Sequence, residues 1–140
     1  MAQKDSRRLF MVIPYLYPDL ASEVVNGDYH LKNDSDGNGT YVVWLNNDIP
    51  EPTAQEIADA KEPALNAHWW KVLRVIRDIL LVESDWSQGA DVPSDLKASY
   101  ATYRTDLRDL PDNVTKPDFD TLNNQSIKEW GISSLMPTKP

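Results

Sequence analysis

One short stretch of the sequence carries oxygen ligands at the spacing of a calcium loop. Asp34, Asp36 and Asn38 alternate along it, and a glycine follows at the sixth place. Calcium binds about six to eight oxygen atoms, and the twelfth place of such a loop normally contributes two of them from one glutamate. Here the twelfth place is Leu45, and the residues after the loop favour a strand over a helix. The stretch Asp34–Thr40 therefore predicts a hairpin turn without metal, with a small calcium-binding module as the alternative.

Residues suited to catalysis are sparse. The chain has two histidines, His30 and His68, and no cysteine, which excludes thiol chemistry and cysteine-based zinc sites. Asp106 and Asp109 form a carboxylate pair, but the helical pattern around them places both on a solvated face, whereas an enzyme would need them in a pocket. No glycine-rich phosphate loop is present. We expect no enzymatic activity, no cofactor and no metal.

Length and charge limit the classes of protein to which this chain can belong. With 140 residues, 41% of them hydrophobic, the chain is long enough for one domain or for a small domain with an arm. Its net charge of −8 argues against a non-specific nucleic-acid binder, because such proteins derive their affinity from lysine and arginine. No apolar run approaches the roughly 20 residues that span a bilayer. We expect no membrane association and folding in a cytoplasm.

Two amphipathic helices joined by a polar turn are predicted between Ala64 and Pro111. The first has apolar residues at spacings of three and four, which share one helical face: Leu65, Trp69, Val72, Leu73, Ile76, Ile79 and Leu80. The second run is Leu96, Tyr100, Tyr103, Leu107 and Leu110. Asp91 and Ser94 are candidate caps of the second helix. Because each helix is apolar on one side only, we expect an antiparallel helical hairpin.

The sequence before the hairpin predicts a small antiparallel sheet. Two strands, Tyr29–Leu31 and Tyr41–Leu45, flank the turn residues. The segment Leu9–Leu20 is apolar and β-branched but contains two prolines, which predicts an edge strand or an extended arm. Thr53 and Glu56 have the spacing of a capping box, so a helix is expected to begin there.

These elements predict an α+β fold in three parts. Residues 1–52 form the arm and the small β region, residues 53–111 the helical hairpin, and residues 112–140 an extended tail. Pro63 ends the first helical segment, kinks it, or lies in the first turn of the long helix. The apolar residues of the tail are scattered, so it is expected to lie on the hairpin or on a partner, with one short helix near Asn123–Trp130.

Aromatic residues are more numerous than a hairpin alone can bury. Trp69 and Trp70 are adjacent, roughly 100° apart on a helix, so a third element must cover one of them. Either the chain's own sheet does so or another protein does, since Trp and Arg are frequent anchors of interfaces. The basic residues of the helices, Lys71, Arg74, Arg77, Arg104 and Arg108, are likewise either ordinary surface partners of acidic residues or a docking face. The predicted partner-binding residues are Trp69, Trp70, Trp86, Arg104, Arg108 and Trp130.

Three short motifs, in the right order, resemble the phage tail assembly chaperone family. The family pattern R-(D/N)-x-L-L-x-x-(S/T)-D-W is similar to Arg77–Trp86, and Y-R-x-x-L-R-D-(L/I)-P is similar to Tyr103–Pro111. A W-P-x-x-P ending resembles Met136–Pro140, where Met136 replaces the tryptophan and Trp130 is a candidate substitute. The resemblance covers about Trp44–Pro111 and the last five residues, and none is seen over residues 1–43.

The hairpin motif also has a physical interpretation. Asp85 is expected to accept from backbone N–H groups in the turn, and Trp86 to fold back over the helix ends. Arg104 and Arg108 lie one turn apart and are expected to hold carboxylates or carbonyls of the facing helix or of a partner.

The resemblance implies a bacteriophage tail-fibre assembly chaperone. Such a protein binds the trimeric fibre protein and assists its folding and trimerisation in the host cytoplasm. It leaves open whether the protein stays on the virion and whether it associates with its own copies. The alternative is a permanent structural component of the phage tail or baseplate.

Overall fold

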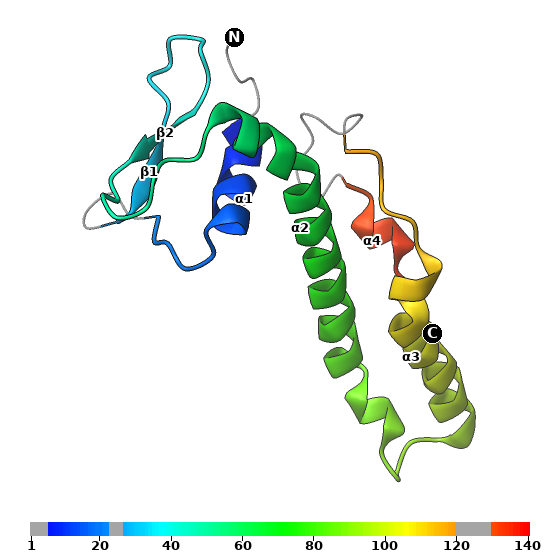
Figure 1. Ribbon diagram of the computed structural model, residues 1–140. Helices are drawn as coiled ribbons and strands as arrows, with labels where there is room; N and C mark the ends of the chain where they lie inside the picture. The colour runs from blue at the N-terminus through cyan, green and yellow to red at the C-terminus, as the bar shows by residue number, and fades with distance from the viewer. Residues whose placement is uncertain (1–5, 23–26, 120–129) are drawn as a thin grey trace. The chain divides into compact units, whose positions relative to one another are not determined.

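The computed structural model describes residues 6–22, 27–119 and 130–140, with an α+β fold of mostly helices and one small sheet (Figure 1). The elements are α1 (Ser6–Leu16), β1 (Tyr29–Lys32), β2 (Tyr41–Trp44), α2 (Ala54–Glu83), a 3₁₀ turn η1 (Asp85–Gln88), α3 (Ser94–Asn113) and α4 (Ile132–Leu135). The predicted α+β class is confirmed. The chain divides into two compact units, an N-terminal unit, Met1–His68, and a C-terminal unit, Trp69–Pro140. The division falls inside α2.

The N-terminal segment is a helix, so the prediction of an edge strand or extended arm over Leu9–Leu20 is wrong. Leu9, Val12 and Ile13 recur at helical spacing and are buried at 3%, 1% and 0% exposure. Val12 packs with Ala60 and Ala64 of α2, and burial of this face outweighs the β propensity of the branched residues. Pro14 lies inside α1 and is exposed, and the helix continues past it to Leu16.

The two strands pair antiparallel, as predicted. Tyr29 is opposite Trp44 and Lys32 is opposite Tyr41, and the rings of Tyr29 and Trp44 stack with centroids 5.9 Å apart. In the connecting loop, Ser35 and two glycines adopt positive φ angles, a conformation that the turn requires. Asn33 accepts from the Ser35 amide and Asp36 from the Asn38 amide, each at 2.9 Å.

The start of α2 confirms the predicted capping box. Glu56 accepts from the Thr53 amide at 2.7 Å, and the Thr53 hydroxyl accepts from the Glu56 amide at 3.2 Å. Pro63 lies inside α2 and does not end it, because α2 runs on from Ala54 to Glu83. The Pro63 ring is exposed to solvent.

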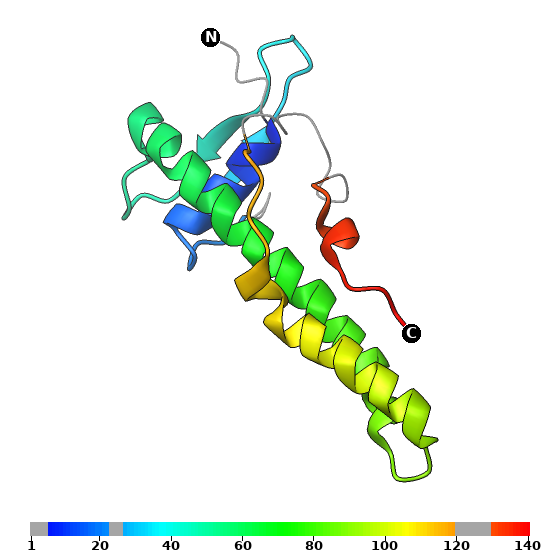
Figure 2. The same ribbon diagram turned by 90° about the vertical axis from the view of Figure 1, so that its right-hand side faces the viewer.

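In the C-terminal unit, α2 and α3 lie side by side as the predicted antiparallel hairpin (Figures 1 and 2). Tyr100, Tyr103 and Leu107 form a buried cluster, against which Leu80 and Leu81 of α2 pack. Two details differ from the prediction: Ile79 and Leu96 are exposed, at 52% and 38%. The cap prediction is also wrong, since Pro93 precedes α3 and makes no side-chain cap bond, so neither Asp91 nor Ser94 caps it.

The tail returns to the hairpin and is not extended throughout. Met136 packs against the Tyr100 cluster, while Phe119, Trp130 and Ile132 are buried. The rings of Phe119 and Trp130 are 5.7 Å apart. One helical turn, α4, occupies Ile132–Leu135, and the predicted helix near residues 123–130 lies almost wholly outside the described residues.

Candidate functional site

The turn between α2 and α3 is organised by one buried arginine. Arg104 of α3 is 9% exposed, and its guanidinium donates to the carbonyl oxygen of Leu81 and to the Ser84 hydroxyl, the latter at 2.8 Å. Its other terminal nitrogen lies 2.7 Å from the Asp85 carboxylate. The expectation that Arg104 holds a carbonyl of the facing helix is confirmed, and the carboxylate that it pairs with, Asp85, lies in the turn η1 and contacts this guanidinium instead of turn amides.

The position of Arg104 follows from the backbone of α2. The last carbonyls of a helix have no partner within it and carry partial negative charge. The Ser84 hydroxyl lies 2.8 Å from the Leu80 carbonyl and 3.0 Å from that of Leu81, so it donates there while it accepts from Arg104. Ser84 and Ser87 are fully buried, and the Ser87 hydroxyl donates to the Ser84 carbonyl at 2.6 Å. A cation at this end of α2 is therefore both hydrogen-bonded and favoured electrostatically.

The rigid turn presents one large aromatic side chain to solvent. Trp86 remains 53% exposed, although its ring meets that of Tyr100 edge-to-face at a centroid distance of 5.1 Å. Trp86 thus contacts α3, as expected of a side chain that folds back over the helix ends, but about half of its surface remains exposed.

The remaining predicted partner-binding residues fall into two groups. Trp69 and Trp130 are buried, at 0% and 9% exposure. Trp70 is half-buried, contacts Trp69 edge-to-face at 4.8 Å, and carries the Arg74 guanidinium 5.7 Å from its ring centroid. Arg108 is exposed on α3. Of the six predicted partner-binding residues, Trp86, Trp70 and Arg108 have solvent-exposed surface that a partner could contact.

Comparison with known families identifies the C-terminal unit. Residues 70–130 match the family described as phage tail assembly chaperone protein. The C-terminal unit is therefore similar to the phage tail assembly chaperone family. The buried Arg104 connects the two longer motifs of the resemblance, because Arg104 belongs to the second motif and is bonded to Ser84 and Asp85 of the first. This similarity supports a role in phage tail assembly.

The N-terminal unit matches a different family. Residues 9–68 match the XkdW protein family, a similarity that the sequence motifs did not reveal. The two matched segments meet at the structural division between His68 and Trp69. The chaperone match reaches residue 130, beyond the expected end at Pro111, and does not include the last five residues. No curated protein and no solved structure matches the chain.

The predicted turn at Asp34–Thr40 uses its carboxylates for protein contacts. Tyr41 donates to Asp34 at 2.7 Å and Lys32 pairs with it at 3.1 Å. Within residues 6–22, 27–119 and 130–140, no group of three His, Cys, Asp or Glu side chains is arranged to hold a metal. Over the same residues, every helix is too short or too polar to cross a membrane.

Proposed function

We propose that this protein is a tail-fibre assembly chaperone, which binds the fibre protein in the host cytoplasm and assists its folding and trimerisation. The family match of residues 70–130 supports the general role in tail assembly. Trimeric fibres expose strand edges and apolar surface until the trimer closes, and a bound helper protein prevents aggregation during that time.

The observation that carries the binding role is the exposed Trp86 on a turn fixed by a buried arginine. Surface loops usually place polar residues at their tips. This tip instead leaves an indole in solvent, and its conformation is held by a buried guanidinium and two buried serines. Exposed Trp side chains on a rigid support are frequent anchors of interfaces. Trp70 and Arg108 are the further candidates on the same unit.

Co-expression with the neighbouring fibre gene tests the proposal. The fibre is expected to be soluble and trimeric only when this protein is present, as measured by fractionation followed by light scattering after size-exclusion chromatography. Equal yields of trimer in both cultures would exclude the chaperone role. Detection of this protein in washed virions, with equal yields, would establish the permanent structural component instead.

A pair of variants locates the binding surface. Trp86→Ala removes the exposed indole and is expected to reduce the yield of soluble fibre trimer. Leu96→Ala removes an apolar side chain that is also exposed on the hairpin, at 38%, and is expected to leave the yield unchanged. Matching losses in both variants would argue against a specific role of Trp86.

A further inference from the structure

Helix α2 has a second apolar face that the hairpin does not use. Val75, Ile79 and Val82 are 49%, 52% and 70% exposed, although Leu73 and Leu80 on the neighbouring face are covered. The exposed residues are spaced by four and three, so they form one straight stripe along the helix. Half-buried Val72 continues the stripe toward the helix start.

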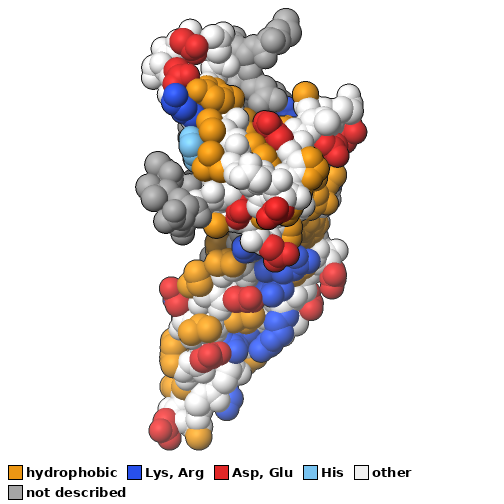
Figure 3. Space-filling view, turned by 60° about the vertical axis from the view of Figure 1, so that its left-hand side comes forward, with side chains coloured by type: hydrophobic (Ala, Val, Ile, Leu, Met, Phe, Trp, Pro, Cys, Tyr) orange, Lys and Arg blue, Asp and Glu red, His pale blue; other side chains and the backbone are white. Residues whose placement is uncertain are grey.

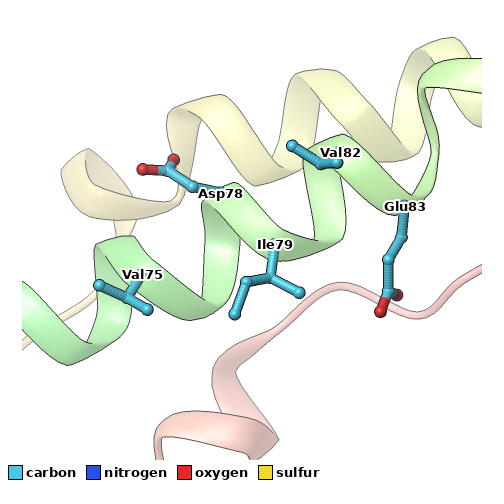
Figure 4. A pocket seen from close by; sticks show the side chains of 5 residues that line it. All are labelled: Val75, Asp78, Ile79, Val82 and Glu83. Carbon is cyan, nitrogen blue, oxygen red and sulfur yellow. The ribbon is translucent and has the colours of Figure 1, made fainter.

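The stripe lines an open groove of about 400 Å³, with Asp78 and Glu83 at its sides. All five lining side chains belong to α2, and α3 passes behind α2 in the view of Figure 4. Hydrophobic side chains lie beside acidic and basic ones along the hairpin in Figure 3. Spacing of four and three residues is the pattern by which one helix packs against another in a coiled coil.

The charges beside the stripe change sign along the helix. Counting 100° per residue along α2 places Lys71, Arg74 and Asp78 on the same side of the stripe. The two basic residues therefore precede the acidic one. The side chain of Asp78 is 60% exposed although it already pairs with Arg77 of its own chain.

We propose that the stripe is a self-association surface, on which the α2 helices of two copies pack antiparallel about a two-fold axis. In this arrangement Val75 meets Ile79 of the second copy and Val72 meets its Val82. The same pairing brings Arg74 beside Asp78 of the second copy. In a parallel pair the two-fold axis would instead place the two Arg74 side chains on opposite sides of the interface, so Arg74 would not meet Asp78 of the second copy.

The size of the surface predicts the strength of the association. A single stripe of about three helical turns is smaller than the roughly 800 Å² per partner of a standard interface. The dimer should therefore be weak and should form in a concentration-dependent manner. It needs no fibre protein, so its failure would not bear on the proposed chaperone role.

Sedimentation equilibrium of the full chain over roughly a hundred-fold range of concentration tests the proposal. The average mass is expected to rise from one chain toward two. Ile79→Glu, at the centre of the stripe, is expected to keep the mass at one chain. Ala101→Glu, which adds the same charge at an exposed position of α3, is expected to behave as the unsubstituted protein.

Charge reversal tests the antiparallel orientation. Arg74→Glu alone is expected to weaken the dimer at least several-fold, because it faces Asp78 of the second copy. The double variant Arg74→Glu with Asp78→Arg is expected to restore it. A mass of one chain at every concentration, a trimer or larger assembly, or an Ile79→Glu effect no greater than that of Ala101→Glu would overturn the proposal. So would a double variant weaker than the single one.

Discussion

Replacing Arg104 by methionine should destabilise the C-terminal unit strongly. Methionine keeps an unbranched apolar side chain but removes the donors to the Leu81 carbonyl and the Ser84 hydroxyl. The Leu81 carbonyl keeps the Ser84 hydroxyl and amide as donors, at 3.0 and 3.2 Å, so what is lost is hydrogen bonding to a charged group, which contributes about 1.5–3 kcal/mol. The Asp85 pair contributes little, since that carboxylate is 63% exposed and screened by water, and methionine also avoids the cost of burying a charge. The expected loss is about 2–3 kcal/mol.

Arg108→Met is the matched control, one helical turn further along α3. Arg108 is exposed, so its replacement should change the free energy of unfolding by no more than about 0.5 kcal/mol. Urea titration followed by far-ultraviolet circular dichroism measures both. With a slope of about 1–3 kcal/mol per molar urea, the Arg104 variant should lose about 0.7–3 M in midpoint. Equal midpoints for the two variants would refute the assignment of Arg104 as the residue that fixes the turn.

Three further outcomes follow from the structure. Trp86→Ala should lower the free energy of unfolding by about 1–2 kcal/mol in circular-dichroism melts. This is less than the roughly 3–5 kcal/mol lost when a buried aromatic is replaced, because half of the Trp86 side chain is already in solvent. A larger loss would mean that the ring is buried in solution. Calorimetry with millimolar calcium should show no heat, because Leu45 replaces the bidentate glutamate; a clear heat would establish a site at Asp34–Thr40. Backbone hydrogen bonds hold the pKa values of Asp28 and Glu56 below the ordinary 3.8 and 4.5, so both carboxylates stabilise the folded N-terminal unit when they are ionised. This stabilisation should be present above pH 5 and should be lost as the pH falls through and below those values. An unchanged melting temperature at pH 3 would contradict the prediction.

The sequence predicted those elements whose local and tertiary preferences agree. Tyr100, Tyr103 and Leu107 recur at helical spacing and are buried on one face, and Thr53 with Glu56 caps α2 as the spacing requires. Local sequence signals gave the wrong prediction where burial of apolar side chains contributed more than local propensity. In α1, burial of Val12 and Ile13 on a helical face outweighed their β propensity, and one exposed proline in the last turn did not prevent the helix.

The candidate site was predictable only in part. The motifs pointed to the turn, and the charge of Arg104 suggested a carbonyl or carboxylate partner. The burial of Ser84 and its bond to Arg104, 20 residues away, could not be predicted, because spacing within each helix does not fix the register between two helices. Ile79 belonged to the periodic apolar set, yet that set covers more than one face of α2, and the pattern alone does not tell which face α3 will cover.

The two family matches and the two structural units support a modular organisation. Each unit has its own buried cluster: Val12 packs with Ala60 and Ala64 in the first, and Tyr100 with Tyr103 and Leu107 in the second. No residue belongs to both clusters, and the boundary at His68 and Trp69 coincides with the end of one match and the start of the next within two residues. A junction inside a helix requires no loop, because the backbone hydrogen bonds of α2 continue through it. The motif residues that fix the hairpin turn therefore lie wholly within residues 70–130, the segment that is similar to the phage tail assembly chaperone family.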